Sequence, residues 1–119
     1  MNNKVSFDFD STLSVNVVED YAKELVCAGF EVWIITTRNH AFYSEVKEVS
    51  DKIGILSSRI IFTSGKDKIQ AIKDIKPIFH LDDDLHEINL INKESETKGI
   101  TNFGNKNWKQ DCEEAILNN

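Results

Sequence analysis

Cysteine, proline and long apolar runs are all scarce in this 119-residue chain. Only two cysteines occur, Cys27 and Cys112, and neither belongs to the paired spacing of a cysteine metal site. Since each lies in a helical pattern, we expect both to be buried structural thiols. No apolar run approaches the roughly 20 residues that span a bilayer. Residues 1–4 lead into a predicted strand without an apolar leader, so we expect a cytoplasmic protein with no membrane partner.

Basic side chains are outnumbered by acidic ones, with 14 Lys and Arg against 20 Asp and Glu and a formal net charge of −6. This balance argues against a strong general surface for nucleic acid, although Lys106 and Lys109 leave room for a local basic spot. The length allows one domain with a real core but no second folded lobe. No linker, repeat or low-complexity tract interrupts the chain. We therefore predict that residues 1–119 form a single domain without a cap domain.

Short apolar strands alternate with amphipathic helices along the chain. The predicted strands are 5–9, 31–36, 59–63, 78–81 and a weaker one at 100–103, and the predicted helices are 15–28, 41–53, 67–75, 85–92 and 108–117. Such alternation implies a parallel sheet with helices on both faces and right-handed crossovers. The sequence thus predicts an α/β protein with a doubly wound, three-layer Rossmann-like fold.

Acidic residues follow two of these strands. Asp8 and Asp10 end the first, and Asp82, Asp83 and Asp84 follow the fourth. In an extended strand, the i, i+2 spacing points both side chains of the first pair to one side, where a cation, usually Mg²⁺, relieves their repulsion. Because the carboxyl ends of parallel strands meet at one edge, the two groups predict one metal site. Solvated strand ends, and a helix cap at Asp84, are the structural alternatives.

Hydroxyl and basic side chains follow the other two strands. The second strand ends in Thr36, Thr37 and Arg38, and the third ends in Thr63 and Ser64, with Lys66 and Lys68 after them. Carboxylates, hydroxyls and ammonium groups at one sheet edge suit phosphoryl transfer, in which charge neutralisation and positioning do most of the catalysis. A carboxylate can also serve as the nucleophile in this chemistry.

Four ordered motifs resemble those of the haloacid dehalogenase-like (HAD) phosphatase superfamily. The family's DxDx[TV] element corresponds to residues 8–13, and its apolar strand ending in Thr to residues 32–36. The lysine before a helix corresponds to Lys68, with Lys66 as the alternative, and the strand ending in an acidic pair to residues 78–83. The match covers essentially the whole chain. It implies a HAD-like fold and a Mg²⁺-dependent phosphomonoesterase of the small capless type.

The resemblance implies a role for each of four carboxylates. Asp8 would be the nucleophile and a Mg²⁺ ligand. Asp10 would protonate the leaving oxygen, then activate the hydrolytic water, and bind the metal through its backbone carbonyl. Asp82 would ligate Mg²⁺ directly, and Asp83 would act beside it or through a water molecule.

The resemblance also implies a phosphate-binding group. Thr36 would hydrogen-bond the phosphoryl group, and Lys68 would neutralise its charge together with that of the nucleophile. Thr37 and Arg38 are further candidates for phosphate or substrate contact, with a solvated loop as the alternative.

The chain departs from the family pattern in its short connections. Only a few residues separate Thr12 from the first helix, where relatives carry a flap or a cap domain. Capless relatives often act on large phosphorylated substrates or use a neighbouring subunit as a lid. A homo-oligomer whose partner subunit supplies a lid is therefore one prediction, and the sequence does not identify the substrate. One alternative function is an inactive phosphate-binding module. Another is a phosphate-accepting receiver domain. In that class an aspartate ends the third strand, whereas the third strand of this chain ends in Thr63 and Ser64, which argues against it. His80, inside the fourth strand, is expected to be a hydrogen-bonded core histidine.

Overall fold

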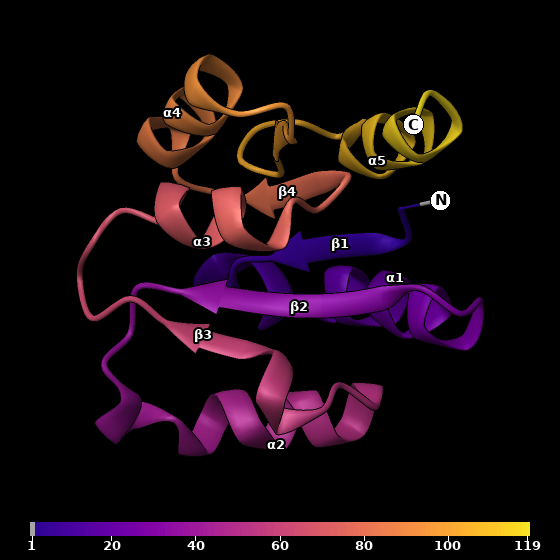
Figure 1. Ribbon diagram of the computed structural model, residues 1–119. Coiled ribbons are helices and arrows are strands. Elements are labelled where there is room, and N and C mark those ends of the chain that lie inside the picture. Colours follow the sequence, from indigo (N-terminus) through magenta and orange to yellow (C-terminus); the bar gives the residue numbers. More distant parts are fainter. Residues whose placement is uncertain (1) are drawn as a thin grey trace.

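The structure is a computed structural model that describes residues 2–119, in which strands and helices alternate (Figure 1). The strands are β1 (Lys4–Phe7), β2 (Glu31–Thr36), β3 (Ile60–Phe62), β4 (Phe79–Asp82) and β5 (Lys98–Thr101). The helices are α1 (Asn16–Cys27), α2 (Ser44–Ile53), α3 (Ile69–Ile75), α4 (Leu85–Glu94) and α5 (Trp108–Leu117). An irregular turn at Phe9–Leu13 follows β1, and short 3₁₀ turns lie at His40–Phe42 and Ser57–Arg59. Within residues 2–119, no helix is long and apolar enough to cross a membrane.

All five strands form one parallel sheet in the order β3-β2-β1-β4-β5. The chain moves outward from β1 to β3, then crosses back to place β4 on the other side of β1. The strand order therefore reverses between β1 and β4, which is where open α/β sheets bind ligands, beyond the carboxyl ends of the strands. The backbone N–H of Asp8, directly after β1, donates to the carbonyl of Leu81 in β4 at 2.8 Å. The ends of these two strands are thus held side by side.

Helices cover both faces of the sheet. One apolar cluster joins it to α1, α2 and α5 through residues such as Val18, Val46 and Cys112. A smaller cluster joins the opposite face to α3 and α4 through Ile72 and Ile91. In Figure 1, α3 lies in front of the sheet and α1 behind it. The α/β architecture with a parallel sheet flanked by helices is confirmed, and it is consistent with a Rossmann-like fold.

Several element bounds differ from prediction, those of β5 and α3 among them. The fifth strand starts at Lys98 and not at residue 100, because Gly99 is a strand residue and not a turn residue. A side-chain carbon at Gly99 would lie 3.0 Å from the carbonyl oxygen of Ile88, so glycine lets α4 approach the strand. The side chain of Asn92 hydrogen-bonds both the N–H (2.8 Å) and the C=O (3.1 Å) of Gly99. Helix α3 begins at Ile69, after Lys68, and not at residue 67.

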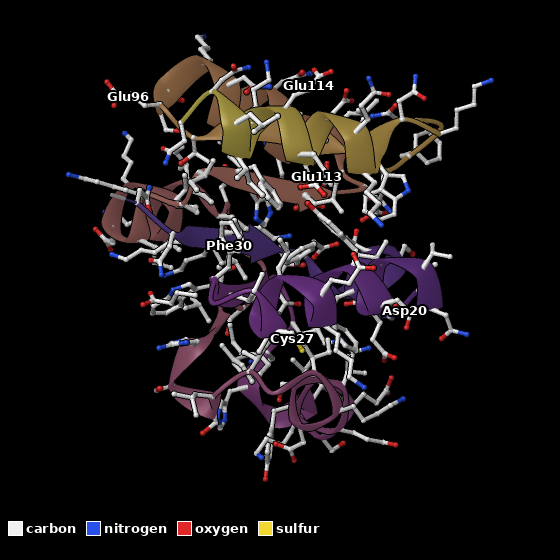
Figure 2. All side chains as sticks on the ribbon, turned by 90° about the vertical axis from the view of Figure 1, so that its right-hand side faces the viewer. Asp20, Cys27, Phe30, Glu96, Glu113 and Glu114 are labelled. Carbon is white, nitrogen blue, oxygen red and sulfur yellow. The ribbon has the colours of Figure 1, made fainter. Side chains whose placement is uncertain are left out.

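One cysteine prediction is wrong. Cys112 is buried in α5, as expected, but Cys27 is exposed. It is the last residue of α1, outside the stripe of buried residues at Val18, Tyr21, Ala22 and Leu25. Figure 2 shows Cys27 on the side of the molecule where the strands begin. This side is opposite the carboxyl edge of the sheet.

Candidate functional site

A buried ammonium joins two carboxylates at the carboxyl edge. The Nζ of Lys68 lies 2.7 Å from Oδ1 of Asp8 and 2.6 Å from Oδ2 of Asp82. The Lys68 residue is only 2% exposed, and both carboxylates are buried. Lys68 immediately precedes α3, which packs on the face of the sheet away from α1, and its side chain reaches β1 and β4. Lys66 is exposed, so the structure places Lys68 with the carboxylates.

The charges of this cluster do not balance. Burial raises the pKa of Asp8 to about 8, although the Lys68 charge opposes the change, and the negative charge of Asp82 adds to it. Burial acts on Asp82 in the same sense, but hydrogen bonds from His80 and Lys68 outweigh it and hold the pKa of Asp82 well below its usual range. The two carboxylates raise the pKa of the Lys68 ammonium despite its burial. Two buried carboxylates therefore share one ammonium, and Asp8 is the one that keeps a proton most readily.

A third carboxylate adds to the negative charge. Asp83 follows Asp82, and oxygens of Asp8, Asp82 and Asp83 lie within 4.8 Å of one another. Three carboxylates against the single charge of Lys68 leave a formal excess of two negative charges when all are ionised. Oxygen ligands and a doubly negative site fit a hard divalent cation such as Mg²⁺. The donor set is thus of the oxygen type that binds such a cation, and Mg²⁺ itself stays a prediction.

A hydrogen-bonded chain positions Asp82 from behind. The Nε2 of His80 lies 2.9 Å from Oδ2 of Asp82, and Nδ1 of His80 lies 2.8 Å from the hydroxyl of Ser6. Burial lowers the pKa of His80. A neutral ring with its proton on Nε2 satisfies both contacts, donating to Asp82 and accepting from Ser6. His80 is the hydrogen-bonded core histidine that was predicted, but its contact with Asp82 was not foreseen.

Asp10 lies apart from the other carboxylates. Strand β1 ends at Phe7, two residues earlier than predicted, and the irregular turn begins at Phe9, between Asp8 and Asp10. The i, i+2 alternation of an extended strand therefore does not apply to Asp8 and Asp10. The carboxylate of Asp10 forms a two-pronged pair with Arg38, at 2.8 Å to one terminal nitrogen and 3.0 Å to Nε. The expectation that both side chains point into one cluster is not met in this structure.

Thr36, the last residue of β2, and Thr37, which follows it, differ in exposure. Thr36 is fully buried, and its Oγ1 accepts a hydrogen bond from the backbone N–H of Arg38 at 3.2 Å. Among residues 2–119 this hydroxyl donates no hydrogen bond, so its hydrogen is available to an oxygen of a bound ligand. Thr37 is exposed, and its carbonyl accepts from the N–H of Gly65. Thr36 is therefore better placed than Thr37 to meet a buried anion.

Sequence reasoning did not assign a role to three residues around the cluster. Thr12 Oγ1 lies 3.3 Å from Oδ2 of Asp8 and 3.1 Å from Oδ1 of Asn102. Asn102 also donates to the carbonyl of Ser11 at 2.9 Å and so secures the turn after β1. Glu87 accepts from the N–H of Lys68 at 2.9 Å. Asn102 directly follows β5. If the predicted strand had ended at residue 101, the search for polar residues at the carboxyl ends of strands would have included Asn102.

Comparison with known proteins finds no matching family model, no matching curated sequence and no matching solved structure. The assignment of a function therefore rests on the chemistry of the site alone.

Proposed function

We propose that the protein is a Mg²⁺-dependent phosphatase of the HAD-like type, which hydrolyses phosphomonoesters through an aspartyl phosphate on Asp8. The observation that carries this proposal is the buried contact of Asp8 with Lys68 at the point where the strand order reverses. A carboxylate attacks an anionic phosphate only where the repulsion between the two is offset. The ammonium of Lys68 offers this compensation, and the free hydrogen of the Thr36 hydroxyl offers a donor to a phosphoryl oxygen.

The reaction consists of two balanced steps. In the first, an oxygen of Asp8 bonds to phosphorus while the bond from phosphorus to the ester oxygen breaks, and Asp10 gives the leaving alcohol its proton. In the second, Asp10 takes a proton from water, and the water oxygen bonds to phosphorus while the bond between phosphorus and the Asp8 oxygen breaks. Inorganic phosphate is released, and Asp8 is a carboxylate again. For this role the carboxylate of Asp10 has to leave Arg38, whose guanidinium then becomes available to the phosphate.

A divalent cation belongs to this proposal. Asp8, Asp82 and Asp83 would hold it through their carboxylate oxygens, with the backbone carbonyl of Asp10 as a further ligand. When bound, Mg²⁺ would supply positive charge that offsets the repulsion between the nucleophile and the incoming phosphate. Asp82 enters that site already ionised and oriented by His80 and Lys68.

One observation favours a second candidate, a phosphate-binding module without turnover. The group that would act as acid and base, Asp10, is engaged by Arg38. If that ion pair persists when substrate binds, the site holds a phosphate but does not release the alcohol. A receiver domain is disfavoured, because the strand order differs from the 2-1-3-4-5 order of that class.

The site is open in this proposal. Only Ser14 and Val15 separate the turn after β1 from α1, which leaves no room there for a flap or an inserted cap. Substrate size is therefore not limited by a lid at this position, and a lid from a second copy stays a prediction.

Hydrolysis of p-nitrophenyl phosphate tests the proposed function. The wild-type protein is assayed with Mg²⁺ and with EDTA, beside Asp8→Asn and the control Asp20→Asn, whose side chain is exposed on α1. We expect Mg²⁺-dependent release of p-nitrophenol from the wild type and from Asp20→Asn, and none from Asp8→Asn. Full activity in Asp8→Asn would overturn the mechanism. Tight binding of phosphate without release by the wild type would favour the second candidate.

A further inference from the structure

A second group of metal-binding residue types lies outside the proposed phosphatase site. Asp67 lies between β3 and α3, and His86 and Glu87 lie in the first turn of α4, so both segments are at the carboxyl edge of the sheet (Figure 1). One imidazole nitrogen and one oxygen from each carboxylate lie within 4.8 Å of one another. We call these three residues the histidine cluster. It offers one nitrogen and two oxygen donors, whereas the three carboxylates described above offer oxygens alone.

Glu87 is a buried carboxylate without a cationic partner. The residue is only 3% exposed, and its Oε2 accepts from the backbone N–H of Lys68 at 2.9 Å. Among residues 2–119 this carboxylate forms no ion pair, and its other oxygen accepts no hydrogen bond. Burial raises the pKa of Glu87, and the nearby Asp67 carboxylate adds to the increase against the opposing effect of Lys68. A cation at the histidine cluster would supply the positive charge that this buried side chain lacks.

The distance between His86 and Asp67 fits two ligands of one ion. Nε2 of His86 lies 3.5 Å from Oδ1 of Asp67. This separation is longer than that of the usual hydrogen bond, about 2.7–3.2 Å. Two atoms that are bound at about 2.0–2.1 Å to a tetrahedral ion lie about 3.4 Å from each other. The two side chains are 70% and 55% exposed, so they are free to turn toward the oxygen of Glu87.

The backbone around the histidine cluster is held in place by hydrogen bonds. The side chain of Asp84 caps α4, accepting from the N–H of His86 at 2.9 Å and from that of Glu87 at 3.4 Å. Glu87 in turn joins α4 to the start of α3 through the N–H of Lys68, which directly follows Asp67. The ligands therefore come from two anchored segments, and little conformational entropy is lost when an ion binds between them.

We propose that Asp67, His86 and Glu87 form a binding site for a divalent transition-metal ion such as Zn²⁺, with water as the fourth ligand. An imidazole with two carboxylates suits Zn²⁺ better than Mg²⁺, which prefers oxygen ligands. The ion would tie the segment before α3 to the first turn of α4. Because the ammonium of Lys68 contacts both buried carboxylates of the phosphatase site, the ion would also fix the backbone from which this ammonium extends. Binding of the ion does not depend on the proposed phosphatase activity.

Calorimetric titration of Zn²⁺ into the metal-free protein tests the site, in a buffer with excess Mg²⁺ to occupy the all-oxygen cluster. Asp67→Ala and His86→Ala each remove one ligand from an exposed position, and Glu87→Gln removes the buried charge but keeps an oxygen acceptor. His40→Ala and Cys27→Ser are the matched controls, because both residues are exposed metal-binding types outside the cluster. Circular dichroism establishes that each variant is folded.

We expect a Zn²⁺-binding event in the wild type whose affinity falls about tenfold or more in each of the three cluster variants. Both controls should bind Zn²⁺ as the wild type does. Zn²⁺ should also raise the melting temperature of the wild type more than that of His86→Ala, since an ion that binds only the folded state stabilises it. Absence of Zn²⁺ binding to the wild type, or an affinity that is unchanged in His86→Ala and Asp67→Ala, would overturn the inference.

Discussion

Replacement of Lys68 by methionine tests the charge balance of the site. Methionine keeps most of the aliphatic volume but removes the ammonium that Asp8 and Asp82 share at 2.7 and 2.6 Å. Removing one partner of a buried ion pair costs about 3–5 kcal/mol, because the other charge stays buried without compensation. Two carboxylates lose their partner here, but Asp8, with a pKa already near 8, can take up a proton and limit the loss. We therefore expect the free energy of unfolding to fall by about 3–5 kcal/mol, a large part of a typical total of about 5–15 kcal/mol.

Urea unfolding followed by circular dichroism, at pH 8 in EDTA and then with Mg²⁺, measures this effect. The control is Lys66→Met, whose side chain is exposed two residues away, and which should change stability by no more than about 0.5 kcal/mol. Mg²⁺ should recover part of the loss in Lys68→Met, since a cation that binds only the folded state stabilises it. If Lys68→Met were as stable in EDTA as Lys66→Met, the reasoning about shared charge would be refuted.

Three other predictions follow from single contacts. The pKa of Asp8 is about 8 in the folded protein and near 4 when unfolded, so the folded protein holds an extra proton between these pH values. The free energy of unfolding in EDTA should therefore fall as pH rises from about 4 to about 8, and the Mg²⁺ affinity measured by calorimetry should rise over the same range. A stability that does not change with pH in this range would contradict the raised pKa of Asp8. Asn92→Ala should lower stability in urea by about 1–2 kcal/mol and increase self-association in sedimentation relative to the wild type, because Gly99 loses two hydrogen bonds that cover the edge strand. An association state identical to that of the wild type would argue against this edge role. An aromatic disulfide reagent should label exposed Cys27 in the native protein and buried Cys112, whose pKa burial raises, only after unfolding; two equally fast thiols would contradict the packing of α5.

Much of the fold could be predicted because periodicity and breakers agree along the chain. The second strand, at Glu31–Thr36, and the last helix, at Trp108–Leu117, have the predicted bounds. Gly54 ends α2 in the left-handed conformation that a helix-stopping glycine adopts. The bounds of β5 were wrong because Gly99 was interpreted as a turn residue. Its place in the strand depends on a contact with α4, which local sequence cannot reveal.

The sequence predicted that the site lies at the carboxyl edge of the sheet, but it did not predict all contacts within the site. The rule that parallel strands end at one edge brought Asp8, Asp82 and Lys68 together correctly. It could not separate Asp10 from them, because the strand pattern does not reveal the irregular turn that begins at Phe9 or the ion pair between Asp10 and Arg38. The roles of all these residues in catalysis stay predictions.

The most direct test of the central claim is detection of a phosphoryl group on Asp8. Asp10→Asn protein is mixed with a reactive phosphomonoester and Mg²⁺, quenched in acid, and mapped by peptide mass spectrometry, with Asp8→Asn as the control. The account predicts a mass increase of one phosphoryl group on the peptide that carries Asp8, absent from the control and from samples with EDTA. Turnover by the wild type without a phosphoryl group on this peptide, or with the group on another residue, would contradict the account.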